Sequence, residues 1–134
     1  MIRILFTCVH NADRSQMAAA FFNQIADSSL AQAISAGTEP ATQIHPEVIR
    51  VMHEMGIELN GVTPRLLTAD LALQANILVT MGCGESCPIV PGAKREDWNL
   101  PDPKGQPLEH VRQIRDEIQE KVDEMVKANG WGTA

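Results

Sequence analysis

A cysteine and an arginine enclose the segment of this chain best suited to chemistry. Cys8 and Arg14 bracket a five-residue loop and are followed by Ser15. The loop comes straight after the apolar run Ile2-Arg3-Ile4-Leu5-Phe6-Thr7, which predicts a strand. In a strand, tight loop, helix arrangement, backbone N–H groups and the helix N-terminus converge on one point and form an anion site. We therefore predict an anion-binding loop made of Val9, His10, Asn11, Ala12, Asp13, Arg14 and Ser15.

The side chains of this loop predict a nucleophile held beside a tetrahedral anion. A cysteine in an electropositive loop is expected to ionise readily, so Cys8 is the predicted nucleophile. Arg14 offers a planar fork that grips two oxygens of an oxyanion. Ser15 can donate its hydroxyl to the thiolate, and Asn11 can fasten the loop through bonds from its side chain to the backbone. The alternative is that Cys8 is a buried structural cysteine.

Asp13 adds a carboxylate beside Arg14. Asp is favoured at helix starts, where it accepts backbone hydrogen bonds and the helix dipole stabilises its charge. We therefore expect Asp13 to cap the following helix and to point away from the anion. The alternative is that its charge opposes the ionisation of Cys8.

Two further cysteines lie in the Gly-rich segment Gly82-Cys83-Gly84-Glu85-Ser86-Cys87-Pro88. Disulfide exchange requires α-carbons to come within about 7 Å of each other, so Cys83 and Cys87 are candidates for thiols that exchange disulfides. The alternatives are half of a metal site and thiols without a role. His10, His45, His53 and His110 lack the spacing of a zinc site, and we expect neither a metal nor a cofactor.

Asp102 is the candidate proton donor. It lies in the predicted loop Glu96–Pro103, between Pro101 and Pro103, which hold the backbone extended. A carboxyl group fixed in this way can be directed at the anion loop and protonate an oxygen that leaves. An Asp-Pro pair alone is usually a turn, so the prediction depends on Cys8 and Arg14.

Length and composition limit the classes of function. The 134 residues, 44% of them hydrophobic, predict one domain over residues 1–134. A net charge of -6 makes nucleic acid and anionic membranes unexpected partners. The N-terminal apolar run is short, contains Arg3 and does not resemble a signal peptide, which predicts a cytoplasmic protein. Three cysteines in a reducing compartment favour redox or catalytic roles over structural disulfides.

Strands and helices are predicted to alternate along the chain. The predicted strands are 2–7, Ala33–Ala36 and Asn76–Met81, and the predicted helices are Ser15–Ala26, 46–56, 68–73 and 107–130. This order predicts an α/β fold, a small parallel sheet with helices on both faces. Ligands of such folds lie beyond the C-terminal ends of the strands. The segments that follow the first and third predicted strands should therefore meet at one edge.

Together, these segments resemble the arsenate reductases built on the low-molecular-weight protein tyrosine phosphatase fold. The matching motifs are Cys8–Ala18, Ser35-Ala36-Gly37, Val79-Thr80-Met81, Cys87-Pro88-Ile89 and the stretch from Asp97-Trp98 to Asp102-Pro103. The resemblance implies a flavodoxin-like α/β fold with about four strands.

The resemblance also implies a three-cysteine relay. Arsenate would bind under Arg14, at a site that phosphate or sulfate also fits, and Cys8 would attack arsenic with Asp102 as the acid. Cys83 would then attack the Cys8 sulfur and release arsenite. Cys87 would take over Cys83, and thioredoxin or a related redoxin would reduce the exposed pair.

Some features depart from the pattern of well-known thioredoxin-coupled members. Cys83 stands one place past their second cysteine, and 80–84 resembles the branch that passes arsenate to a small thiol and then a redoxin. Ala19 and Arg65 occupy the positions where some members hold potassium with acidic side chains.

Two further readings are a protein tyrosine phosphatase of this fold and a non-catalytic redox or anion sensor. The phosphatase would need Cys8, Arg14 and Asp102 but neither Cys83 nor Cys87. With no Tyr, 3 Phe and 2 Trp, the chain has few aromatic walls for a phosphotyrosine ring.

Overall fold

The computed structural model describes residues 1–82 and 92–132, and strands alternate with helices as predicted. The elements in chain order are β1 (Ile2–Cys8), α1 (Arg14–Ile25), β2 (Ala31–Gly37), α2 (Pro46–His53), α3 (Ala69–Leu73), β3 (Ile77–Thr80), β4 (Lys94–Asp97) and α4 (Leu108–Asn129). Each predicted helix and strand is present, with its ends displaced by a few residues. Within the described ranges, no helix is both long and apolar enough to cross a membrane.

The strands form one parallel sheet in the order β2-β1-β3-β4. The register pairs Cys8 with Gly37, and Thr80 pairs with both Thr7 and Asp97. The C-terminal ends of all four strands therefore lie along one edge of the sheet. This is the edge at which ligands of open parallel sheets bind.

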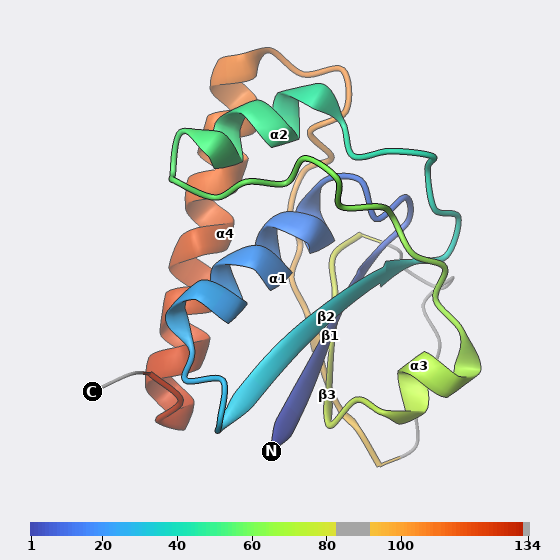
Figure 1. Ribbon diagram of the computed structural model, residues 1–134, viewed down its shortest axis with the longest axis vertical. Coiled ribbons are helices and arrows are strands. Elements are labelled where there is room, and N and C mark those ends of the chain that lie inside the picture. Colours follow the sequence, from blue (N-terminus) through green and yellow to red (C-terminus); the bar gives the residue numbers. More distant parts are fainter. Residues whose placement is uncertain (83–91, 133–134) are drawn as a thin grey trace.

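Helices cover both faces of the sheet, as predicted. Figure 1 shows α1 and α4 on one side and α3 on the other. Side chains alternate along β1: Ile4 and Phe6 pack into the main core with α1 and α4, whereas Leu5 packs with Ala72 of α3. The ring centre of Phe6 lies 5.5 Å from that of Trp98, which joins the main core to the chain that follows β4.

One element was not predicted. Lys94–Asp97 is a strand, so the expectation of a loop is wrong for Glu96 and Asp97. All four residues of β4 are charged, and the strand shows no apolar alternation that could reveal it. Backbone pairing with β3 holds it in place, and charged side chains suit the exposed edge of a sheet.

Candidate active site

Cys8 is the last residue of β1, and the loop 9–13 connects it to α1. Its side chain is fully buried. The end of β2 closes this side of the loop, because the Gly37 backbone lies directly against it. A β-carbon at Gly37 would stand 2.6 Å from the carbonyl oxygen of Val9 and 2.8 Å from the amide nitrogen of Asn11. Only glycine permits that approach.

Backbone hydrogen bonds fix the orientation of the loop peptides. The carbonyl oxygens of Val9 and His10 accept hydrogen bonds from the N–H groups of Glu39 and Ala41, at 2.8 and 3.0 Å. The carbonyl and N–H of a trans peptide point in opposite directions. The N–H groups of the same peptides are therefore directed away from the segment that follows β2. Such a set of N–H groups, next to a helix N-terminus, is suited to an anion.

Asn11 fastens the loop as predicted. Its Nδ2 donates to Ser15 Oγ at 2.7 Å, and its Oδ1 accepts from the backbone N–H of Arg65 and from Gln16 Nε2, both at 2.9 Å. Asn11 also adopts a left-handed backbone with φ of 50°. Because Ser15 Oγ already accepts a hydrogen bond from Asn11, its own hydroxyl can donate to the Cys8 sulfur, 2.9 Å away.

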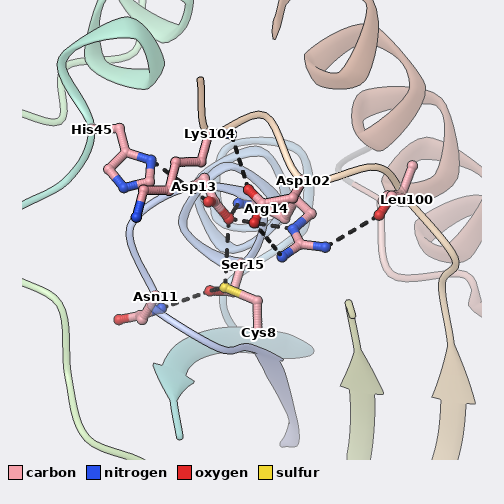
Figure 2. A network of polar contacts seen from close by, with 9 residues as sticks. All are labelled: Cys8, Asn11, Asp13, Arg14, Ser15, His45, Leu100, Asp102 and Lys104. Carbon is pink, nitrogen blue, oxygen red and sulfur yellow. Dashed lines mark hydrogen bonds and ion pairs between the residues drawn. The ribbon is translucent and has the colours of Figure 1, made fainter. Parts of the chain in front are cut away.

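Arg14 lies between the loop and the chain that follows β4 (Figure 2). Its side chain is buried, and Nη1 donates to the Leu100 carbonyl oxygen at 3.2 Å. Nη2 lies 3.9 Å from Asp102 Oδ2. The predicted anion-gripping residue and the predicted acid are thus neighbours, although 88 positions separate them in the sequence.

Asp13 caps α1 as predicted, because its Oδ1 accepts the backbone N–H of Arg14. The prediction that it points away from the anion is wrong. The carboxylate is buried, and Oδ1 accepts a hydrogen bond from Cys8 Sγ at 3.7 Å. Oδ2 lies 3.6 Å from His45 Nδ1 and has no hydrogen-bond partner among the described residues. Asp13 therefore contacts the nucleophile directly.

The electrostatics at Cys8 also differ from expectation. Burial raises the pKa of the Cys8 thiol above its ordinary value, and the Asp13 carboxylate raises that pKa further. Hydrogen bonds from Ser15 and the charge of Arg14 act in the opposite direction, without reversing the shift in pKa. The expectation that Cys8 ionises readily is therefore wrong for the free protein, because burial and Asp13 outweigh the basic groups.

Asp102 lies at the solvent side of the site, with 47% of its side chain exposed. Partial burial would raise the pKa of Asp102, but the Lys104 N–H, which donates to it at 2.9 Å, and the Arg14 charge lower that pKa below its usual range. The carboxyl group is therefore ionised at neutral pH in the free protein. It has to gain a proton before it can act as an acid.

The remaining predicted site residues and two unpredicted ones complete the arrangement. Cys83 and Cys87 lie outside the described residues. His45 and the Leu100 carbonyl belong to the site without having been predicted. His45 precedes Pro46 at the start of α2, and no motif connects it to the loop. A backbone carbonyl carries no signal in the sequence at all.

Comparison with known proteins gives this arrangement a context. The family model described as low molecular weight phosphotyrosine protein phosphatase matches residues 3–129. A relative named "Putative arsenate reductase", from Halobacterium salinarum, is 40% identical over 123 residues, covering 87% of this chain and 85% of its own. A "Glutaredoxin arsenate reductase" from Synechocystis is 33% identical over 129 residues, covering 94% of this chain and 97% of its own.

A solved structure of similar fold is that of a thioredoxin-dependent arsenate reductase from Corynebacterium glutamicum. It superposes with a TM-score of 0.83 at 38% identity and covers 96% of this chain. The present chain spans 61% of the length of that protein.

Proposed function

The chain belongs to the low molecular weight phosphotyrosine protein phosphatase family, and on that premise we propose that it reduces arsenate to arsenite, with a redoxin as its reductant. The convergence of Cys8, Arg14 and Asp102 at one edge of the sheet carries the proposal. Relatives named as arsenate reductases, similar over nearly the whole chain, support arsenate as the oxyanion.

The first step joins sulfur to arsenic. Arsenate binds in the loop 9–15 with two of its oxygens on the Arg14 guanidinium. The Cys8 sulfur attacks arsenic, and the arsenic–oxygen bond opposite breaks. Asp102 protonates the departing hydroxide, which leaves as water. The negative charge of arsenate favours the protonated form of Asp102, so substrate binding itself prepares the acid.

The second step reduces arsenic. Cys83 attacks the Cys8 sulfur, the arsenic–sulfur bond breaks, and its electron pair remains on arsenic, which leaves as arsenite. The protein is left with a disulfide between Cys8 and Cys83. Cys87 then attacks Cys83, which restores the Cys8 thiol and leaves a Cys83–Cys87 disulfide for the redoxin to reduce.

The order of this relay is tested by single-turnover reactions of prereduced variants. In Cys87→Ser, we expect one arsenite per chain and a trapped disulfide between Cys8 and Cys83, identified by peptide mapping. In Cys83→Ser, the reaction should stop at the arsenic adduct. A Cys8–Cys87 disulfide with released arsenite in Cys83→Ser would show that either thiol can attack and that the ordered relay is wrong.

Phosphatase activity is the alternative that the same residues favour. A phosphotyrosine ring needs aromatic or apolar walls, but Phe6, Phe21, Phe22 and Trp98 are buried in the core, and Trp131 packs on Phe22 near the end of α4. Steady-state assays separate the two activities: arsenate with thioredoxin or glutaredoxin on one side, and an aryl phosphate without reductant on the other. We expect turnover of arsenate with at least one redoxin and only weak hydrolysis of the ester. Efficient hydrolysis without redoxin-dependent arsenate turnover would contradict the proposal.

A further inference from the structure

The mechanism above gives Asp13 no task, although Asp13 contacts the reacting atom. Its side chain is 1% exposed, and its Oδ1 is the acceptor for the Cys8 thiol at 3.7 Å. Cys8 starts as a thiol in a buried site and must lose its proton before or during the attack on arsenic. A proton acceptor in direct contact with the sulfur meets that need.

We propose that Asp13 is the general base of the first step, which accepts the thiol proton of Cys8 as the sulfur attacks arsenic. The inference rests on the proposed arsenate reduction. It assigns Asp13 a catalytic role in addition to its role as the cap of α1.

The surroundings of Asp13 fit a proton acceptor. Oδ1 faces Cys8 and lies 3.4 Å from Arg14 Nε. Oδ2 is buried without a hydrogen-bond donor among the described residues, and the ring nitrogen of His45 is 3.6 Å away. Asp102 also lies at this end of the site, where Arg14 Nη2 approaches it from the same guanidinium. The Asp13 side chain and the charge of His10 both contribute to the lowered pKa of Asp102. Figure 2 shows the Asp13 and Asp102 carboxyl groups meeting at Arg14, with Cys8 below Asp13.

Once arsenate binding has left Asp102 protonated, the step balances without a further proton from solution. The thiol proton moves from Cys8 Sγ to Asp13 Oδ1 as the sulfur–arsenic bond forms. The arsenic–oxygen bond breaks, and the departing hydroxide takes the proton of Asp102. The proton on Asp13 then replaces the one that Asp102 has lost. The sum is a thiol and hydrogen arsenate giving a sulfur–arsenate adduct and water, with no change in total charge or in the oxidation state of arsenic.

Two roles of Asp13 predict opposite effects of Asp13→Asn: a general base that accepts the thiol proton, and a negative charge that only opposes the ionisation of Cys8 (an electrostatic brake). Asn has the size of Asp and is equally favoured as a helix cap, but it cannot accept the thiol proton. Removing the carboxylate lowers the Cys8 pKa in either case. If Asp13 is only a brake, the reaction with arsenate accelerates. If Asp13 is the base, the reaction slows although the thiolate forms more easily.

The test compares two measurements on the wild type and Asp13→Asn across pH. Arsenite release in a single turnover of prereduced protein gives the second-order rate constant with arsenate and needs no redoxin. Ultraviolet absorbance of the thiolate gives the Cys8 pKa in a Cys83→Ser, Cys87→Ser background, in which Cys8 is the last thiol. Asp70→Asn, an exposed carboxylate in the first turn of α3, is the matched control and should change neither value.

We expect the thiolate to form at lower pH in Asp13→Asn, while the arsenate rate constant at neutral pH falls about 10²-fold. The difference in the arsenate rate constant between the two proteins should become smaller above the Cys8 pKa of the wild type, because Cys8 is then already a thiolate and needs no base. A rate constant that rises together with the thiolate fraction would overturn the proposal. A wild type that releases no arsenite would refute the proposed function itself, which is a different result.

The wild type provides a second measurement in case Asp13→Asn does not fold. If Asp13 acts as a base, the rate constant of the wild type with arsenate should decline less steeply than its thiolate fraction as the pH falls below the Cys8 pKa. A parallel decline of the two quantities would mean that only preformed thiolate reacts, and the role of Asp13 as a base would be wrong.

Discussion

At the residue scale, the site depends on a few charged side chains that contact one another. Arg14 contacts the Leu100 carbonyl, Asp102 and Asp13, so its guanidinium connects the loop, the predicted acid and the proposed base. A planar fork makes these contacts and also grips two oxygens of an anion, which a point charge cannot do.

Arg14→Lys should therefore lose anion affinity and activity while remaining folded. Each lost charge-assisted hydrogen bond is worth about 1.5–3 kcal/mol, which corresponds to about 10- to 160-fold in kcat/KM for arsenate. The inhibition constant of phosphate, a competitor of arsenate, should also rise in Arg14→Lys. Arg50→Lys, on the exposed part of α2, serves as the control. Near-normal kinetics of Arg14→Lys would mean that Arg14 has a structural role only.

Asp102→Asn should lower kcat by about 10²- to 10⁴-fold, the usual worth of a positioned proton donor. Arsenate binding should change little, because Asp102 is protonated, and therefore neutral like Asn, when arsenate is bound. The wild-type rate should fall as the pH rises through the pKa of Asp102 in the arsenate complex, and Asp102→Asn should lack this alkaline decline. Weaker binding with unchanged turnover would identify Asp102 as a loop anchor.

Contacts within the loop could be predicted from the sequence, and contacts between distant segments could not. Asn11, Ser15 and Cys8 lie in one strand, loop, helix unit, whose local geometry brings them together. His45 reaches Asp13 only because α2 begins where it does. The direction of the Asp13 side chain was mispredicted because helix capping alone does not determine what else a cap contacts.

At the element scale, Gly82, which lies just after β3, leaves room for the Arg14 guanidinium. Gly82 has φ of 98°, and a β-carbon there would stand 2.2 Å from Arg14 Nη1, much closer than a van der Waals contact allows. The sequence shows the glycine as a break after the strand, but it does not show the guanidinium that the glycine makes room for.

Gly82→Ala should displace Arg14 and weaken phosphate binding about 10-fold or more, in proportion to the lost hydrogen bonds. Gly61→Ala is the matched control, because Gly61 has a similar φ of 85° and open space around it. Both variants should lose stability through backbone strain, but only Gly82→Ala should lose affinity in calorimetry with phosphate. Equal affinities would show that Arg14 adapts to the added methyl group.

At the scale of the whole molecule, an ion cluster joins the C-terminal end of α2 to α4. Glu54 accepts from Arg112 at 2.7 Å and from Arg115 at 2.8 Å, and Arg115 also donates to the Val51 carbonyl oxygen at 2.9 Å. The hydrogen bond from Arg112, aided by Arg115, lowers the pKa of Glu54 to about 2. The helices α2 and α4 could be predicted from the periodicity of their apolar residues. The ion cluster could not, because it joins residues far apart in the sequence.

Glu54→Gln should lower the melting temperature by a few degrees at neutral pH, because both arginines lose their carboxylate. Since the folded pKa is depressed, the contribution of Glu54 is present above its ordinary pKa of 4.5 and is lost as the pH falls through about 2. The difference in melting temperature between the two proteins should shrink over that acidic range. Glu117→Gln, on the exposed face of α4, should show no such pattern. A difference that does not vary with pH would attribute the effect to packing.

The proposed function depends above all on the reaction of Cys8 with arsenate within this one chain. The most direct test mixes prereduced protein with arsenate, without any redoxin, and measures the arsenite released in a single turnover. We predict one arsenite per chain for the wild type and none for Cys8→Ser, because a hydroxyl lacks the acidity and the soft nucleophilicity of a thiol. Equal arsenite release from both proteins, or none from a wild type that readily hydrolyses an aryl phosphate, would contradict arsenate reduction by Cys8.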